Sequence, residues 1–267
     1  MNTHLPRMAA AGLLLAAAGA QAAPFVFNDN DLLLTFHRTG SPDFEVNIGS
    51  ALTYASATSS FAVGGYTASQ ISSIFGNTDG LSWSVMGGVR PGGGNASTPA
   101  NTLWLTRART DASVATLSYD RKSSSTQGAI SSTINGIAGN GSIAGAVPWS
   151  SGTTANPVSN TSTAVSIPSG DPNSYTQLAG QLGNLNGSFS QSGLENTVPA
   201  GGLPTSSDLY EILPGTGKSI YLGRFDMGQN GTLLFTPVPE PGTMALLGLG
   251  GLLFLARRAR PSDKQTD

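Results

Sequence analysis

Side chains that could carry out chemistry are few in this chain of 267 residues. It contains no cysteine, which excludes thiol nucleophiles, disulfides, thiolate zinc sites and iron–sulfur clusters. His4 and His37 are the only imidazoles, so a single chain cannot supply a multi-histidine metal site. A Ser-His-Asp triad would depend on His37, and no Gly-x-Ser-x-Gly nucleophile elbow occurs in the sequence.

Paired carboxylates are the remaining candidates for catalysis, because two of them can hydrolyse a glycosidic bond. Asp29 with Asp31 and Asp43 with Glu45 are the obvious pairs. Residues two apart on a strand share one face, however, so these pairs are expected to form the solvent-exposed face of a strand. We predict no catalytic residue and no enzymatic activity.

Two features could bind a ligand without catalysis. If Leu103 and Leu105 face the core, Trp104 faces the other way and could stack on a sugar ring; alternatively, both faces of this strand are covered. Residues 28–31 and 77–80 are oxygen-rich loops of the kind that bind calcium outside cells, although neither is an EF-hand. We predict no cofactor and no metal site, and leave calcium open.

A glycine-rich segment resembles the end of a phosphate-binding loop, but the resemblance is partial. Gly215-Thr216-Gly217-Lys218-Ser219 lacks the first glycine of the full pattern, whose position holds Ile212, and a strand pattern follows it. We predict a turn at this point. The net charge of −2 provides no basic field for nucleic acid.

Several segments alternate with the two-residue period of a half-buried strand. Residues 31–38 and 43–48 form a predicted hairpin, in which Phe44 and Val46 share one face. Asn230-Gly231 predicts a type I′ turn before the last strand. Further strands are predicted at 81–86, 102–107, 209–213, 219–227 and 232–236.

Helical patterns are short. Thr67 with Gln70, and Ser174 with Gln177, form predicted capping boxes at helix starts. Isoleucines within residues 130–137 have helical spacing, although neighbouring glycines weaken this pattern.

The body of the chain is predicted to be one domain, residues 23–237. The part between about residues 139 and 172 is rich in Ser, Thr, Gly and Pro and is expected to be a long surface excursion. The predicted fold class is mainly β: an antiparallel β-sandwich with two or three short helices on its connections.

The N-terminus has the three parts of a secretory signal peptide. A short basic start precedes the apolar residues 8–20, which are too few to span a bilayer. Ala20 and Ala22 supply the small-x-small pattern of a cleavage site. We predict a signal peptide at residues 1–22 that is cut after Ala22.

The C-terminus combines a rigid segment, an apolar run and a basic cluster. The uncharged residues 243–256 would form a helix of about 20 Å, against about 30 Å of hydrocarbon, which makes a weak permanent anchor. The basic cluster favours a cytoplasmic C-terminus, with the body on the other side of the membrane. The rigid segment is Val238, Pro239, Glu240 and Pro241, the membrane stop is Arg257, Arg258 and Arg260, and a polar tail covers residues 261–267.

Residues 238–260 resemble the PEP-CTERM sorting signal of Gram-negative bacteria. The resemblance implies that an exosortase recognises Pro239, Glu240 and Pro241, removes the hydrophobic helix and releases the body outward. It also implies a bacterium that makes extracellular polysaccharide. A plain C-terminal membrane anchor is the alternative.

These patterns predict an exported cell-surface or extracellular-matrix protein of unknown molecular activity. Signal peptidase and exosortase are its expected processing partners during transient attachment to the inner membrane, and no nucleic acid is expected. The alternative function is a secreted carbohydrate-binding module in an exopolysaccharide matrix, with Trp104 as the stacking residue.

Overall fold

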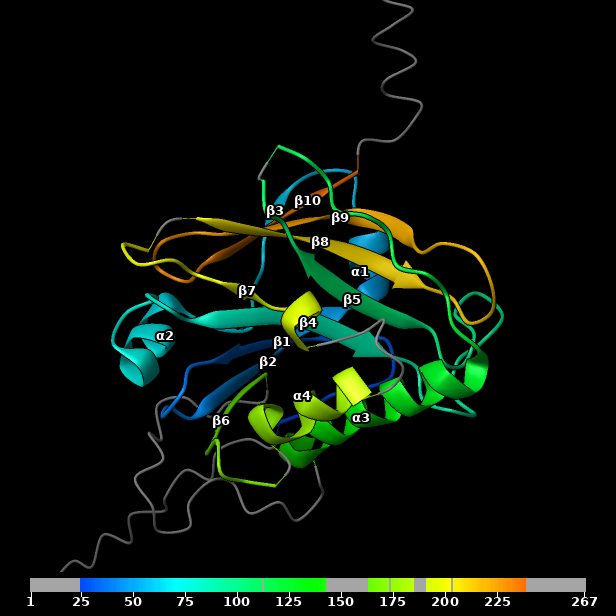
Figure 1. Ribbon diagram of the computed structural model, residues 1–267, viewed down its shortest axis with the longest axis horizontal. Coiled ribbons are helices and arrows are strands. Elements are labelled where there is room, and N and C mark those ends of the chain that lie inside the picture. Colours follow the sequence, from blue (N-terminus) through cyan, green and yellow to red (C-terminus); the bar gives the residue numbers. More distant parts are fainter. Residues whose placement is uncertain are drawn as a thin grey trace, which may run out of the picture.

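The computed structural model describes residues 25–111, 113–142, 163–172, 174–184, 191–202 and 204–238. Within these residues, ten strands form one antiparallel sheet in the order β3-β10-β9-β8-β5-β4-β1-β2-β6, with β7 paired to β4 (Figure 1). The strands are β1 (Asp31–His37), β2 (Asp43–Ser50), β3 (Phe61–Ala62), β4 (Ser82–Gly88), β5 (Leu103–Ala108), β6 (Ala164–Ile167), β7 (Asn196–Thr197), β8 (Thr205–Ile212), β9 (Ile220–Met227) and β10 (Leu233–Pro237).

Helices lie against both faces of this sheet. The inner face packs against α1 (Ala51–Ala55) and α2 (Ala68–Phe75), and the outer face against α3 (Ser124–Ser142), α4 (Tyr175–Asn184) and α5 (Gln191–Leu194). The prediction of two or three short helices was therefore too low, and α3 alone has 19 residues.

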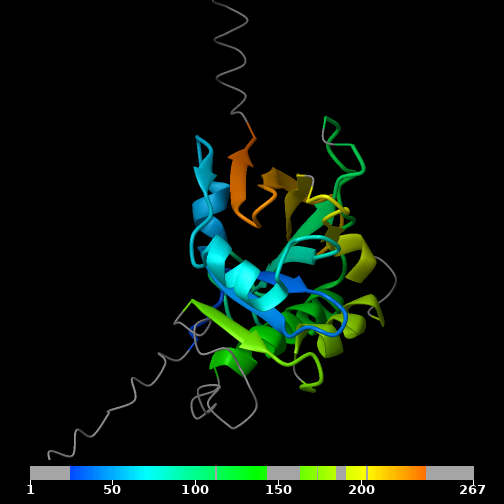
Figure 2. The ribbon, with the colours of Figure 1, turned by 90° about the vertical axis from the view of Figure 1, so that its left-hand side faces the viewer.

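Two apolar cores result, because side chains alternate across each strand. Leu32, Leu34 and Phe36 of β1 belong to the inner core, whereas Leu33 belongs to the outer one. The sheet curls so that β9 and β10 stand over β1 and β2, with α1 in contact with β2, β9 and β10 (Figure 2). Because there is a core on each face of the sheet, strands such as β1 are buried on both faces.

The mainly β, antiparallel class is confirmed, but the strands do not form the two sheets of a sandwich. β5 pairs with β4 through Leu105 and Met86 and with β8 through Leu105 and Tyr210, which joins the two halves into one hydrogen-bonded sheet. Alternation in the sequence defines the faces of each strand but not its neighbour. The strand patterns in the sequence therefore could not predict how many sheets the strands form.

Most local predictions are confirmed. β1 and β2 form the predicted hairpin, and Thr67 and Gln70 form both bonds of the predicted capping box at α2. The prediction of a type I′ turn is wrong, because such a turn needs a positive φ at both residues, and Gly231 has one, of 80°, but Asn230 does not. The predicted excursion contains β6, and its residues 143–162 lie outside the described part.

Candidate functional site

The predicted sorting segment begins where the sheet ends. Pro237, the last residue of β10, pairs with Gly223 of β9, and the Val238 amide donates to the Leu222 carbonyl at 3.2 Å. No flexible linker separates the sheet from the segment, because Val238 is still hydrogen-bonded to it. The other predicted processing and membrane residues lie outside the described residues: Ala20, Ala22, Pro239, Glu240, Pro241, Arg257, Arg258 and Arg260.

Gly223 sets how closely the end of β10 approaches β9. A Cβ atom at this position would lie 2.5 Å from the Thr236 carbonyl oxygen and 2.9 Å from the Pro237 Cα. These distances are shorter than any van der Waals contact, so only glycine permits this approach. The end of β10 is thereby held against the sheet immediately before the sorting segment.

Asp43 belongs to one of the predicted carboxylate pairs. It is buried under α4 instead of facing solvent. The Thr176 amide and the Thr176 hydroxyl each donate to its carboxylate at 2.7 Å. The carboxylate thus satisfies a free N–H in the first turn of α4 and faces the positive end of the helix dipole. Burial raises the pKa of Asp43, and the bonds from Thr176 oppose that shift. Its place indicates a structural role.

Glu45, the second member of this pair, is fully buried. Neither carboxyl oxygen has a hydrogen bond of ordinary geometry among the described residues, although the Tyr175 N–H lies near enough to favour the charged form. Burial, followed by repulsion from Asp43, holds the pKa of Glu45 well above its usual range. The expectation that this pair forms a solvent-exposed face was wrong, because α4 covers that face.

His37 lies at the edge of the same polar region. Its Nε2 is 3.0 Å from Oε1 of Glu195, an ion-pair distance without the alignment of a hydrogen bond. Burial opposes charging of the imidazole, but the Glu195 carboxylate outweighs it and raises the pKa of His37. The Tyr175 hydroxyl also donates to Glu195. These contacts join β1, α4 and the segment after α5.

Trp104 does not support the predicted sugar-stacking role. It has no exposed surface and lies in the inner core, while Leu103 and Leu105 lie in the outer core. The sequence alternatives are thereby resolved: both faces of β5 are covered. A ring with no exposed surface cannot stack on a ligand, so the prediction of Trp104 as a stacking residue is wrong.

Several oxygens in the loops considered for calcium are already used within the chain. Asp31 accepts from Asn28 and Asn47, and Asp29 pairs with Arg90 at 3.0 Å. In residues 77–80, the guanidinium of Arg38 donates to the carbonyl and side-chain oxygens of Asn77. No group of three metal-ligating side chains is found within the described residues.

The glycine-rich segment after β8 is a turn, as predicted. The Gly215 amide donates to the Lys122 carbonyl, and Lys218 forms an exposed ion pair with Asp120. β9 follows it where a phosphate-binding loop would begin a helix. The segment therefore lacks the geometry of a phosphate cradle.

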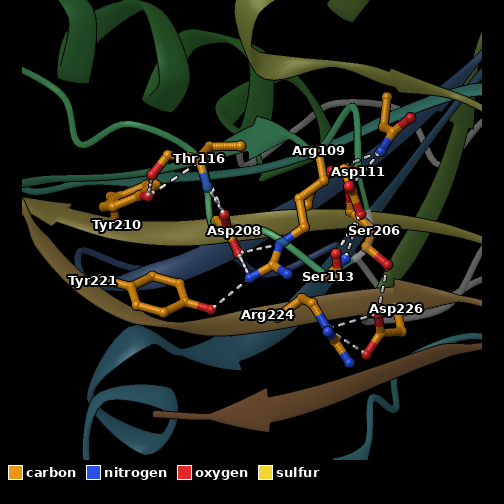
Figure 3. A network of polar contacts seen from close by, with 12 residues as sticks. Arg109, Asp111, Ser113, Thr116, Ser206, Asp208, Tyr210, Tyr221, Arg224 and Asp226 are labelled. Atoms are coloured by element: carbon orange, nitrogen blue, oxygen red, sulfur yellow. Dashed lines mark hydrogen bonds and ion pairs between the residues drawn. The ribbon is translucent and has the colours of Figure 1, made fainter.

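A polar network that the sequence did not indicate fixes the chain after β5 to β8 and β9 (Figure 3). Asp208 is fully buried and accepts from Arg109 at 2.6 Å and from the Thr116 amide at 2.6 Å. Arg109 also donates to the Tyr221 hydroxyl at 3.1 Å, and Tyr210 donates to the Thr116 carbonyl at 2.6 Å. With every carboxylate oxygen used, the network has a structural role.

A pocket of about 590 Å³ lies beside α2. We call it the α2 pocket; its walls are α2 itself, the loop at residues 76–79, the turn at 201–202 and the turn at 229–230. Its volume falls within the range of about 300–1,000 Å³ usual for small-molecule sites. Asn77 and Asp79, both considered for calcium, line this pocket.

Comparison with known proteins bears on the C-terminal segment. The family model of the PEP-CTERM protein-sorting motif matches residues 237–260. The chain carries a PEP-CTERM motif. No curated protein and no solved structure matches the chain significantly.

The PEP-CTERM motif implies an exported protein that an exosortase processes and that is sorted at the membrane. Its first matched residue, Pro237, is the last residue of β10. Among the described residues, no helix has the length and apolar character needed to cross a membrane. The motif follows directly on the folded body and shares only Pro237 with β10.

The sequence missed the partners that define the other sites. Glu195 and Tyr175 lie far along the chain from His37, and nothing local marks them as neighbours. Gly202 and Gln229, which line the α2 pocket together with Asp79, are also far from it along the chain. The turn residues at 201–202 were the available signal, since paired glycines with positive φ often occur where a loop approaches a ligand.

Proposed function

We propose that this chain is the precursor of a non-enzymatic cell-surface or extracellular-matrix protein, whose PEP-CTERM helix is removed during export. One observation carries the proposal: the motif begins at the last residue of β10. Cleavage beyond Val238 removes the apolar residues 243–256 and leaves every described strand intact. The product keeps its cores and loses its most apolar segment.

A non-enzymatic role is supported by the state of the candidate carboxylates. Asp29 and Asp31 are held by Arg90 and by asparagine side chains, and Asp43 is held by α4. A glycosidase needs two carboxyl groups facing one substrate bond. The pairs suggested by the sequence do not provide this arrangement.

The experiment is intact-mass analysis of cell-associated and released protein, with and without the host exosortase. The released form is expected to lack residues 1–22 and everything beyond the Pro-Glu-Pro site. Without exosortase, the full C-terminus is expected to remain on membrane-bound protein. Released protein that retains its C-terminus would contradict the proposal.

A variant with Pro239, Glu240 and Pro241 replaced by alanine tests the motif directly. We expect it to accumulate in the membrane fraction with a folded body, because the last described strand ends at Pro237, before these residues. The matched control replaces three residues of the polar tail, 262–264, by alanine and should be released like the wild type. Equal release of both variants would remove the role of the motif.

A second candidate function is carbohydrate binding in an exopolysaccharide matrix. Its original support, Trp104, is buried. The α2 pocket favours it instead, because amide and carboxylate side chains line a space of ligand size.

A further inference from the structure

Polar groups that lack a partner within the described residues line the α2 pocket. The Asp79 carboxylate and the Gln229 side-chain amide make no hydrogen bond or ion pair there; the bonds of both residues involve their backbone atoms. The pocket therefore presents a free acceptor and a free amide from different loops.

Two asparagine side chains have their orientation fixed by neighbours. Asn77 Oδ1 accepts from Arg38 at 3.1 Å and from the Asp79 amide at 3.1 Å. Asn230 Oδ1 accepts from the Thr232 amide at 3.1 Å and the Thr232 hydroxyl at 2.6 Å. Because both oxygens are engaged, each side chain keeps its NH₂ group as a donor for a ligand.

Hydrogen bonds tie the walls of the pocket to one another and to the fold. The Thr78 hydroxyl donates to the Gln229 carbonyl at 2.8 Å, and the Tyr66 hydroxyl donates to the Gly231 carbonyl at 2.7 Å. The capping box fixes the start of α2. Donors and acceptor are thus held in place before a ligand binds, which lowers the entropy cost of binding.

The set of groups selects for an uncharged ligand rich in hydroxyls. No Lys, Arg or His lines the pocket, and its one carboxylate repels anions. A single carboxylate beside NH₂ donors is a poor cation site, since calcium takes six to eight oxygens. A hydroxyl both donates and accepts, so neighbouring hydroxyls of a sugar match a carboxylate flanked by amide donors.

The pocket lies at the opposite end of β10 from the sorting motif. Gln229 and Asn230 precede β10, whereas the motif follows it. The strand has five residues, which separates its ends by about 17 Å. The end of the sheet that carries the pocket is therefore turned away from the end that leads into the membrane segment.

From these observations we infer that the α2 pocket binds a saccharide unit, with Asp79 accepting hydroxyl protons and the amides of Asn77, Gln229 and Asn230 donating. The inference rests on the proposed export to the cell surface, where polysaccharide would be met. It names the ligand class of the second candidate function and the residues that recognise it.

The test is saturation-transfer NMR on the full chain, held in a zwitterionic detergent that has no sugar head group. The probes are D-glucose, D-mannose, D-galactose and N-acetylglucosamine. At least one is expected to receive saturation, and Asp79→Asn is expected to weaken its binding about tenfold, the loss of one charge-assisted hydrogen bond. The control Asp111→Asn, at an exposed carboxylate outside the pocket, should bind like the wild type.

A second variant tests the space itself. A Cβ atom at Gly202 would lie 3.3 Å from Thr78 Oγ1 and 3.8 Å from Asp79 Oδ1, so Gly202→Ala is expected to reduce binding. Gly92→Ala is its control, because Gly92 also has a positive φ, of 80°, but a Cβ there meets nothing. Normal unfolding midpoints for both variants would show that they fold.

Three outcomes would overturn the inference: no saturation of any probe, unchanged binding by Asp79→Asn, or binding that requires added calcium. Since this test uses the unprocessed chain, it is independent of exosortase. Failure to bind sugar with normal processing would refute the pocket alone, whereas sugar binding with a retained C-terminus would refute the sorting proposal alone.

Discussion

Replacing Glu45 by glutamine tests whether the carboxyl group buried under α4 is uncharged in the folded protein. Glu45 has no exposed surface, and neither of its carboxyl oxygens has a hydrogen bond of ordinary geometry among the described residues. Burial holds its pKa well above the ordinary value of 4.5. Glutamine has nearly the same shape and does not ionise, so the pH-dependent part of its effect reports the titration of Glu45.

The sign of the effect follows from proton linkage. The folded protein holds the Glu45 proton more tightly than the unfolded chain does. The stability this provides is complete below pH 4.5, the ordinary pKa, and is lost as pH rises through the folded pKa. One such group changes the free energy of unfolding by at most about 1.4 kcal/mol per pH unit. The free energy of unfolding of Glu45→Gln should therefore rise relative to that of the wild type as pH rises, by at most about 3–4 kcal/mol at pH 7.

Urea unfolding at a series of pH values measures this difference. Trp83 and Trp104 are both fully buried, so their fluorescence reports on unfolding of the inner core. Asp79→Asn is the control at an exposed carboxyl and should follow the wild type. His37 adds a second window, because its raised pKa provides stability below pH 6.5 that is lost as pH rises through the folded value.

Parallel curves for Glu45→Gln and the wild type between pH 5 and 8 would refute the assignment of an uncharged carboxyl. If the variant instead becomes progressively less stable than the wild type as pH rises, the assignment would be reversed. That result would mean that the charged form is favoured, through donors such as the Tyr175 N–H. Glu45→Gln combined with His37→Gln should leave little pH dependence above pH 6.5.

Two further predictions concern the contacts that hold the sheet. Asp208→Ala removes the acceptor of the buried Arg109 contacts and should lower the free energy of unfolding by about 3–5 kcal/mol in urea titrations, a size that distinguishes a buried pair. Asp120→Ala breaks an ion pair of the same 2.6 Å length that is mostly exposed, and should leave stability unchanged; equal losses would contradict this reasoning. Gly223→Ala should cost about 1–3 kcal/mol and speed amide exchange in β10, and normal exchange there would show that the strand end adjusts freely.

Local features were predictable because their causes lie within a few residues. Thr67 and Gln70 satisfy each other's backbone groups across one helical turn, so the capping box could be identified from spacing alone. The β1–β2 hairpin follows from alternation on both sides of a short turn. The sorting motif is also a linear pattern of rigid, apolar and basic parts, and the family match at residues 237–260 agrees with it.

Burial was less predictable, because it depends on what covers a strand. Asp43 and Glu45 alternate with apolar residues as an exposed face would, yet α4 arrives from more than a hundred residues later and covers them. Trp104 is covered in the same way on the inner face. Alternation reports that two faces differ, not that one of them meets water.

By itself, the sequence determined the sorting motif and the longer strands, since such motifs, caps and alternation all act over short distances. Only the tertiary structure decided which polar residues meet. It brought Glu195 to His37, Asp208 to Arg109, and Gln229 to the loop of Asp79. Such pairs depend on the order of strands in a curled sheet, and that order is chosen by the packing of the whole chain.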